Sequence, residues 1–228
     1  FARCVLLKTA QWALDCRKEI PSAADFRRQL VRSLVEMKEG AAEFARAMAP
    51  RLNVTATCLH RSSAGIEYEP TIKKLPPPKL VVTSPPYPGV HVLYHRWQVQ
   101  GRRETPAPYW IANSLDGDGA SFYTFGDRKQ PKLSTYYEAA LAAFTSIAKI
   151  STRETTVVQM IAFNDPSWQL PEYLATMERA GFGEIFFRHL SDSEDGRLWR
   201  NIPNRKFYAD QKGATTSSKE VVLFHRPL

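Results

Sequence analysis

Two apolar runs limit what this chain can fold into. Residues 79–83, KLVVT, and residues 155–163, TTVVQMIAF, are apolar on both faces instead of alternating between apolar and polar. Strands with this pattern lie in the middle of parallel sheets, where both faces are covered. Helical patterns separate and surround the two runs, so the sequence predicts an α/β fold.

Four segments have the apolar spacing and the flanking residues of helices. They cover residues 1–17, 22–48, 133–150 and 171–180. The second begins with Ser22 followed by Asp25, which approximates a capping box, and its apolar stripe is predicted to be buried. The last has Pro171 in its first turn and Gly181 just past its end, the usual order of these two residues at helix ends.

Strands are predicted at residues 53–59, 79–83, 155–163, 184–189 and 220–225. The region 84–131 is rich in Pro, Gly, aromatic and basic residues, and we interpret it as a long functional loop with at most a helical turn or two over 92–98. A second polar and basic excursion covers 190–219. The order strand, helix, strand, helix, strand, strand predicts an antiparallel finish to the sheet.

Composition limits the setting of the protein. The 228 residues carry a formal net charge of +8, which favours a polyanionic partner such as nucleic acid. No apolar run approaches the roughly 20 residues that span a bilayer, and the N-terminus lacks the layout of a signal peptide. The three cysteines form no C-x-x-C pair, which favours a reducing compartment. We therefore expect a cytoplasmic, nucleoid-associated protein without a membrane partner.

The sharpest local signal is the run Thr83, Ser84, Pro85, Pro86 and Tyr87, placed where a buried strand ends. In open α/β sheets, ligands bind beyond the carboxyl ends of the strands, so this is the expected place for a site. A proline-stiffened surface loop, or a polyproline ligand for a small adaptor domain, would explain the same residues.

This Thr-Ser-Pro-Pro-Tyr run resembles the catalytic motif of the S-adenosylmethionine-dependent amino-methyltransferases that modify N4 of cytosine or N6 of adenine in DNA. The predicted elements that follow agree in order with that family. The resemblance implies a Rossmann-like methyltransferase sheet, present from its third strand onward, with an antiparallel terminal hairpin and an added helical segment near the N-terminus. It divides the chain into a helical segment at 1–50 and a catalytic core at 51–228, with loop insertions at 88–131 and 190–219.

The resemblance also assigns roles within the motif. An exocyclic base amine is a poor nucleophile, so the base must leave the stack and its amine hydrogens must meet acceptors. The Ser84 side chain and the Pro85 carbonyl would accept from the amine, and Tyr87 would stack on the extruded base. Pro85 and Pro86 would stiffen the backbone in advance. Methyl transfer would be direct, and positioning would contribute most of the acceleration.

The cofactor implied is S-adenosylmethionine. The opening residues from Phe1 resemble the helix that follows the family's Asp-x-Asn-Pro segment, so the glycine-rich cofactor loop would lie upstream or on a second chain. His60 stands in the third-strand region where many relatives place an adenine-contacting Asp, and Thr83 precedes the motif. The resemblance thus assigns cofactor contacts to Phe1, His60 and Thr83.

Two stretches combine cations with aromatic residues and follow the strand ends proposed as the site. The DNA-binding candidates in them are Arg96, Trp97, Arg102, Arg103, Arg200, Arg205 and Lys206. Phosphate contacts combined with base stacking would use such residues, and a solvated basic face explains them about equally well.

Other chemistries fit less well. A C5-cytosine mechanism needs a nucleophilic cysteine next to proline, which this chain lacks, and its histidines and cysteines do not make zinc-ligand spacings. The leading hypothesis is a DNA amino-methyltransferase for restriction-type marking or defence. An RNA base methyltransferase and a cofactor-free nucleic-acid-binding subunit remain as alternatives.

Overall fold

The computed structural model describes residues 1–51, 54–89, 91–92, 96–100, 103–114, 122–123, 125–126, 129–191, 193–201 and 219–228. The chain forms two compact units. We call the described residues up to 59 and from 92 to 122 the helical unit, and the other described residues the sheet unit. The first break between the units falls after residue 59, whereas the expected boundary was at residue 50. The described residues between 92 and 122, within the expected loop insertion, belong with the helical unit.

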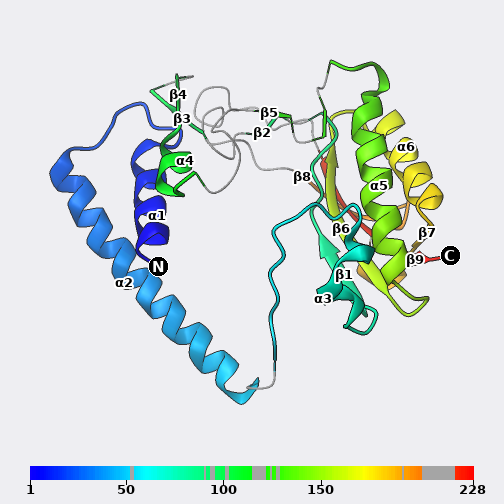
Figure 1. Cartoon of the computed structure of the whole chain (residues 1–228). Coiled ribbons are helices and arrows are strands. Elements are labelled where there is room, and N and C mark those ends of the chain that lie inside the picture. The colour runs from blue at the N-terminus through cyan, green and yellow to red at the C-terminus, as the bar shows by residue number, and fades with distance from the viewer. Residues whose placement is uncertain are drawn as a thin grey trace. The chain divides into compact units, whose positions relative to one another are not determined.

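The helical unit is built around its first helix (Figure 1). Its elements are α1 (Ala2–Leu14), α2 (Ala23–Met48), the 3₁₀ turn η1 (Ala49–Arg51), β3 (Trp97–Val99), β4 (Arg103–Thr105) and α4 (Ala107–Ile111). Helix α1 contacts α2, α4 and β3, while β3 and β4 form an antiparallel hairpin. Val5, Ala10 and Ala13 on α1 are buried, as are Trp97 and Val99 on β3, so these apolar side chains form the small core of the unit.

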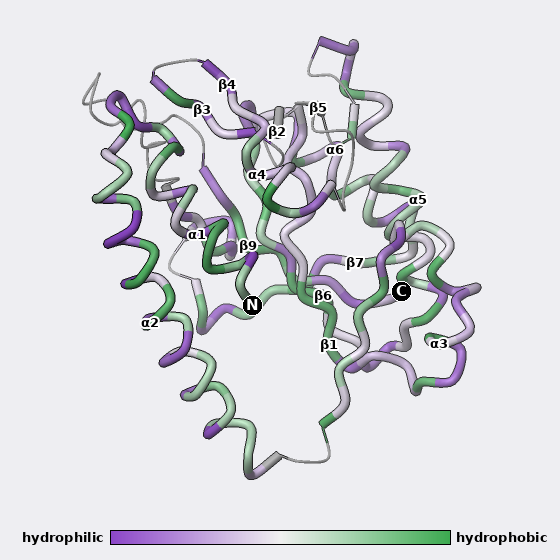
Figure 2. Tube along the Cα trace, turned by 60° about the vertical axis from the view of Figure 1, so that its left-hand side comes forward, coloured by the Kyte–Doolittle hydropathy of each residue, from purple (hydrophilic) through white to green (hydrophobic). Residues whose placement is uncertain are grey.

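The long helix α2 begins as predicted but is not buried as predicted. The Ser22 side chain accepts a hydrogen bond from the backbone N–H of Asp25 at 3.1 Å, which confirms the cap. The predicted buried stripe is wrong: Phe44 is 68% exposed, and the helix buries only Ser33. The reason is length, because 26 residues extend about 39 Å and the 13 residues of α1 about 20 Å. Figure 2 shows hydrophobic residues recurring along α2.

The sheet unit contains a mixed five-stranded sheet in an α/β arrangement. The strands are β1 (Leu80–Thr83), β6 (Thr156–Phe163), β7 (Phe182–Ile185), β8 (Leu198–Asn201) and β9 (Lys219–Pro227). The order is β1-β6-β9-β7, with β1 and β6 parallel and β9 antiparallel to β6. Strands β8 and β7 pair with the first and last parts of β9, respectively. The strands expected at 79–83 and 155–163 and the antiparallel finish are therefore confirmed, but β1 lies at the edge of the described sheet and not in its middle. The strand expected at 184–189 is found earlier, at 182–185.

Shorter elements complete the described parts of the chain. They are η2 (Ile66–Tyr68), α3 (Pro70–Lys73), β2 (His91–Val92), β5 (Phe122–Tyr123), η3 (Pro131–Leu133) and η4 (Arg188–Leu190). Strands β2 and β5 pair with each other. None of the helices in the described ranges combines the length and the apolar character needed to cross a membrane.

Helices α5 (Ser134–Ile150) and α6 (Pro166–Arg179) pack against each other and cover one face of the sheet (Figure 1). Val157, Ile161 and Phe163 of β6 point into this core and are at most 1% exposed. The opposite face of β1 is open: Leu80 is 57% exposed and Val82 70%. The sheet unit therefore has one covered apolar face and one partly uncovered apolar face.

Three local predictions need correction. Residues 54–59 form no strand, so the expected third strand is absent and the sheet begins at β1. β-branched residues favour strands only where a neighbouring strand is present to pair with them, and no described strand pairs with residues 54–59. The helical turn expected over 92–98 is wrong, because the described residues of this range belong mostly to strands β2 and β3. Strand β8, inside the excursion expected at 190–219, was not predicted.

Helix α6 begins earlier than predicted. The Asp165 side chain accepts from the backbone N–H of Ser167 at 3.1 Å, and Pro166 occupies the first helical position. Pro171 therefore lies inside the helix and not in its first turn. The predicted end is correct, since Gly181 follows α6 with a φ of +94°.

A buried polar network lies under α6. Tyr173 donates to the side-chain oxygen of Gln159, so the Gln159 amide nitrogen donates to Nδ1 of His225 at 3.2 Å. His225 is 1% exposed, and its Nε2 has no partner among the described residues. Burial, together with the positive charge of Arg197, lowers the pKa of His225 from 6.5 to about 4. The imidazole is therefore held neutral in the core.

This network makes folding stability depend on pH. Between pH 6.5 and about 4 the unfolded chain binds a proton at His225 that the folded chain does not, so stability rises with pH in this window and is lost as pH falls through it. The full difference is worth about 3 kcal/mol, at about 1.4 kcal/mol per pH unit. Urea unfolding at about pH 7.5 and about pH 4.5 measures it. His225→Gln should flatten this dependence, while His189→Gln, at an exposed position, should leave it unchanged.

Candidate functional site

The motif forms the corner where β1 ends. Thr83 is the last residue of the strand and is half-buried, Ser84 is exposed, and Pro85 is buried. Pro86 and Tyr87 are half-buried. The rigid prolines therefore pack inward while the serine hydroxyl is presented at the surface, at the carboxyl end of a strand where α/β sheets place their ligands.

The tyrosine of the motif is held by the last strand. The Tyr87 hydroxyl donates to a carboxylate oxygen of Glu220 at 2.5 Å, and the second oxygen of Glu220 accepts from Nε of Arg200. Glu220 begins the buried part of β9 and is 6% exposed. One chain of hydrogen bonds therefore links Tyr87, in the loop after β1, to Glu220 on β9 and Arg200 on β8.

This link explains the ionisation of both groups. Burial opposes the charge on Glu220, but the hydrogen bonds from Tyr87 and Arg200 outweigh it and lower the pKa of the carboxyl. Burial and the bond to Glu220 raise the pKa of Tyr87, against a smaller opposing effect of a hydrogen bond with Ser84. Tyr87 is therefore a neutral donor, and Glu220 is an ionised acceptor at neutral pH.

A second tyrosine fixes the backbone of the motif. The Tyr136 hydroxyl, from the first turn of α5, donates to the Pro86 carbonyl at 2.8 Å. Tyr136 is 2% exposed and packs against the Phe125 ring, with the ring centroids 5.6 Å apart. Burial keeps its pKa well above the ordinary value of 10.0. The Pro86 carbonyl is thus occupied, while no described residue donates to the Pro85 carbonyl.

The arrangement can present two acceptors at a rigid corner. The Ser84 oxygen lies at the surface, and the Pro85 carbonyl belongs to a peptide held between β1 and the bond from Tyr136 to Pro86. Two acceptors fixed before a ligand arrives suit a group with two N–H hydrogens, such as an amine, because no reorganisation is needed on binding. Their positions are set by packing and not by loop conformation alone.

The basic residues predicted from sequence fall in different places. Arg200, in the sheet unit, has its charge paired with Glu220. In the helical unit, Arg103 is exposed, whereas Arg96 lies 4.0 Å from the carboxylate of Glu104. Trp97 is 8% exposed, and this burial does not support a base-stacking role. Arg102, Arg205 and Lys206 lie outside the described residues.

The predicted cofactor contacts are not brought together in one unit. Phe1 is exposed in the helical unit, while His60 and Thr83 belong to the sheet unit. His60 lies in a stretch without secondary structure, not at the tip of a strand. Across the described ranges, no group of three or more His, Cys, Asp or Glu side chains is placed to hold a metal ion.

Sequence reasoning missed two residues of this site. Glu220 was predicted only as the first residue of a strand, and Tyr136 only as part of an apolar helical stripe. A signal for Glu220 was present, because an acidic side chain directly beside Val221 and Val222 in a central strand requires buried partners. Tyr136 gave no signal beyond its hydroxyl, which must also find a partner when buried.

Comparison of the chain with protein-family models, with curated proteins and with solved structures found no match. The function must therefore be argued from the residues and the geometry described above.

The bond from Tyr136 to Pro86 can be tested by removing one oxygen atom. Tyr136→Phe keeps the ring in the core but leaves the Pro86 carbonyl without its donor, so we expect the free energy of unfolding to fall by about 1 kcal/mol. Urea unfolding measures the change. Tyr68→Phe, which removes the hydroxyl of a 66% exposed ring, is the matched control and should have no effect. Equal stability of the Tyr136→Phe variant would show that this bond does not hold the motif.

Proposed function

We propose that this chain forms the target-base side of an S-adenosylmethionine-dependent amino-methyltransferase that acts on DNA. The observation that carries the proposal is the Ser84-Pro85-Pro86-Tyr87 corner at the end of β1. It exposes Ser84 and leaves the Pro85 carbonyl free of described donors, while Tyr136 and Glu220 hold the rest of the motif.

The proposed chemistry uses the two acceptors of the corner. An exocyclic amine of an extruded cytosine or adenine donates its two hydrogens to Ser84 Oγ and to the Pro85 carbonyl, which draws the nitrogen lone pair out of the ring. Tyr87 offers its half-buried ring to the base while Glu220 holds its hydroxyl. The amine nitrogen, activated in this way, would accept the methyl group that S-adenosylmethionine supplies, and the proton it releases would pass to water.

The sheet supports the same interpretation. The motif strand β1 is followed by a helix, a parallel strand, a second helix and then antiparallel strands, which is the order of elements in the family that the motif resembles. We interpret this sheet as the second half of a Rossmann-like methyltransferase sheet. The added helices α1 and α2 would be the extra helical segment.

The cofactor side of the site is not formed by the described residues. Within the described ranges, the one pair of parallel strands is β1 and β6, and neither is followed by a glycine-rich turn into a helix. S-adenosylmethionine would supply the electrophilic methyl group, and Thr83, beside the motif, is the predicted contact best placed to adjoin it. We propose that a segment upstream of this chain, or a second chain, provides the remaining contacts.

Methylated bases in cells test the proposal without knowledge of the recognition sequence. The complete gene product that contains this chain is expressed in a host without DNA methylation, and nucleosides from DNA and from RNA are measured by mass spectrometry. We expect N4-methylcytosine or N6-methyladenine in DNA. Ser84→Ala and Tyr87→Ala should lower it at least about a hundredfold, as removal of a preorganised polar contact does in other enzymes. Ser63→Ala, at an exposed serine without side-chain bonds, is the control and should change nothing.

The other outcomes separate the alternatives. Methylated bases found in RNA alone would favour an RNA base methyltransferase. DNA binding without any methylated base would favour a nucleic-acid-binding subunit. Methylation that persists in both motif variants would remove the motif from the mechanism.

The open side of β1 supports completion by another segment. Among the described strands, β1 pairs with β6 alone and its other edge is open, and Leu80 and Val82 are largely exposed although both are apolar. Proteins usually protect an edge strand with charged residues, bulges or short length, and an apolar pattern on both faces is typical of interior strands. We infer that a further strand lies beside β1 in the complete protein.

A charge at this edge tests that inference. In this chain alone, Val82→Lys should change the free energy of unfolding by no more than about 0.5 kcal/mol, because the side chain is exposed. In the complete gene product it should lower stability by about 2 kcal/mol and reduce DNA methylation, because completion of the sheet beside β1 would cover the face on which this side chain lies. Glu154→Lys, at an exposed turn, controls for the added charge. An effect of equal size in both proteins would contradict the missing strand.

A further inference from the structure

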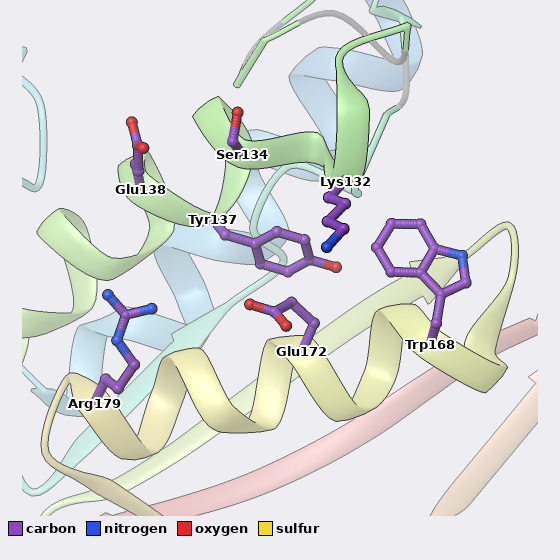
Figure 3. Close-up of a pocket in the computed structure, with 7 residues that line it drawn as sticks. All are labelled: Lys132, Ser134, Tyr137, Glu138, Trp168, Glu172 and Arg179. Atoms are coloured by element: carbon purple, nitrogen blue, oxygen red, sulfur yellow. The ribbon is translucent and has the colours of Figure 1, made fainter.

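A cavity separate from the motif lies between α5 and α6. Its volume is about 660 Å³, within the range of ligand-binding pockets. The lining residues are Lys132, Ser134, Tyr137, Glu138, Trp168, Glu172 and Arg179 (Figure 3). None of them belongs to the motif, and all belong to the sheet unit. The proposed methyl transfer makes no use of this cavity.

The charged groups around the cavity form no ion pairs within the part of the chain that the structure describes. Lys132 and Arg179 carry positive charge, Glu138 and Glu172 carry negative charge, and none of the four forms an ion pair with another described residue. The indole nitrogen of Trp168 also lacks a described acceptor. Exposed side chains of opposite sign that share one cavity without pairing leave their donors and acceptors available to a ligand.

One end of the cavity combines both charges with an aromatic wall. Trp168 and Glu172 are four residues apart on α6 and therefore lie on the same face, about 6 Å apart along the helix axis. Figure 3 shows the amine end of Lys132 beside the hydroxyl of Tyr137, the carboxylate of Glu172 below the Tyr137 ring, and the Trp168 ring on the hydroxyl side. Tyr137 is 6% exposed and its hydroxyl donates to the Gln169 carbonyl at 3.2 Å, so this wall is fixed.

The backbone that carries Lys132 is strained. Lys132 and Leu133 have φ values of +54° and +52°, in the left-handed region that residues other than glycine rarely adopt. Two such residues in succession cost stability, and they persist only where the surrounding structure holds them. Leu133 is 5% exposed in the core, so its burial fixes the turn that directs Lys132 to the cavity.

We propose that this end of the cavity binds a free aromatic α-amino acid. The ligand's ammonium group pairs with Glu172, its carboxylate pairs with Lys132, and its ring stacks on Trp168. The balance of charge supports a zwitterion, because a carboxylate beside the cation disfavours a phosphate and a lysine beside the anion disfavours a simple amine. Arg179 lies seven residues beyond Glu172, about 10 Å further along α6, at the other end of the cavity from Trp168 (Figure 3).

Four small probes test the proposal on the intact chain. They are L-phenylalanine, 2-phenylethylamine, which lacks the carboxylate, 3-phenylpropionate, which lacks the ammonium group, and L-alanine, which lacks the ring. Binding is followed by the indole N–H signal of Trp168 in ¹H–¹⁵N NMR spectra, assigned from its loss in Trp168→Phe. We expect L-phenylalanine to bind at about millimolar concentration and each of the other three about tenfold more weakly.

Two variants assign the contacts. Glu172→Gln should remove the advantage of L-phenylalanine over 3-phenylpropionate, and Lys132→Gln should remove its advantage over 2-phenylethylamine. Glu178→Gln changes an exposed carboxylate of the same helix that does not line the cavity, and it should leave all four affinities unchanged. The other indole signals report whether each variant remains folded.

Three results would overturn the proposal. Equal binding of the three compounds with a ring would show that the ring alone binds. Equal binding of L-alanine and L-phenylalanine would show that Trp168 provides no ring contact. Absence of any shift of the Trp168 signal at saturating L-phenylalanine would show that the site binds no aromatic amino acid. None of these results bears on methyl transfer, so the two proposals stand or fall separately.

Discussion

The geometry of the motif depends on the hydrogen bonds that the buried carboxylate of Glu220 accepts. This carboxylate lies on the last strand, yet it accepts from Tyr87, which is 133 residues earlier in the chain, and from Arg200. A carboxylate at 6% exposure is stable only with such partners, and removing one of them would leave a charge or a hydroxyl unsatisfied. The hydrogen bond that the Tyr136 hydroxyl donates to the Pro86 carbonyl holds the backbone of the motif. Together these bonds hold the Tyr87 side chain and the Pro86 backbone in place.

The elements that sequence reasoning located correctly are those whose signal is local. Helix α5 and strands β1 and β6 follow from apolar spacing within the element itself, and they lie within two residues of the predicted limits. Residues 53–59 carried an equally local strand signal and form no strand where described, because a strand exists only with a neighbour. The apolar stripe of α2 failed for a related reason: spacing shows which residues share a face, but the length of α1 decides how much of that face is covered.

The candidate site was located from the sequence, but its supports were not. Residues Ser84 to Tyr87 were singled out because they follow a strand that is apolar on both faces. The partner of Tyr87 is too distant in sequence for any spacing rule to reveal it, since β9 enters the sheet between β6 and β7. Arg200, a candidate for phosphate contact, pairs with Glu220, and composition alone could not reveal this partner. Long-range pairing is thus the part of the site that only the fold supplies.

The central place of β9 has a consequence for how the sheet forms. Among the described strands, β7 and β8 pair with β9, so neither gains a sheet partner until β9 is in place. Strand β6 can already pair with β1, but its other edge stays open until β9 joins it. Contacts between segments distant in sequence form late, so slow docking of β9 would leave apolar strand edges exposed to aggregation and to capture by chaperones.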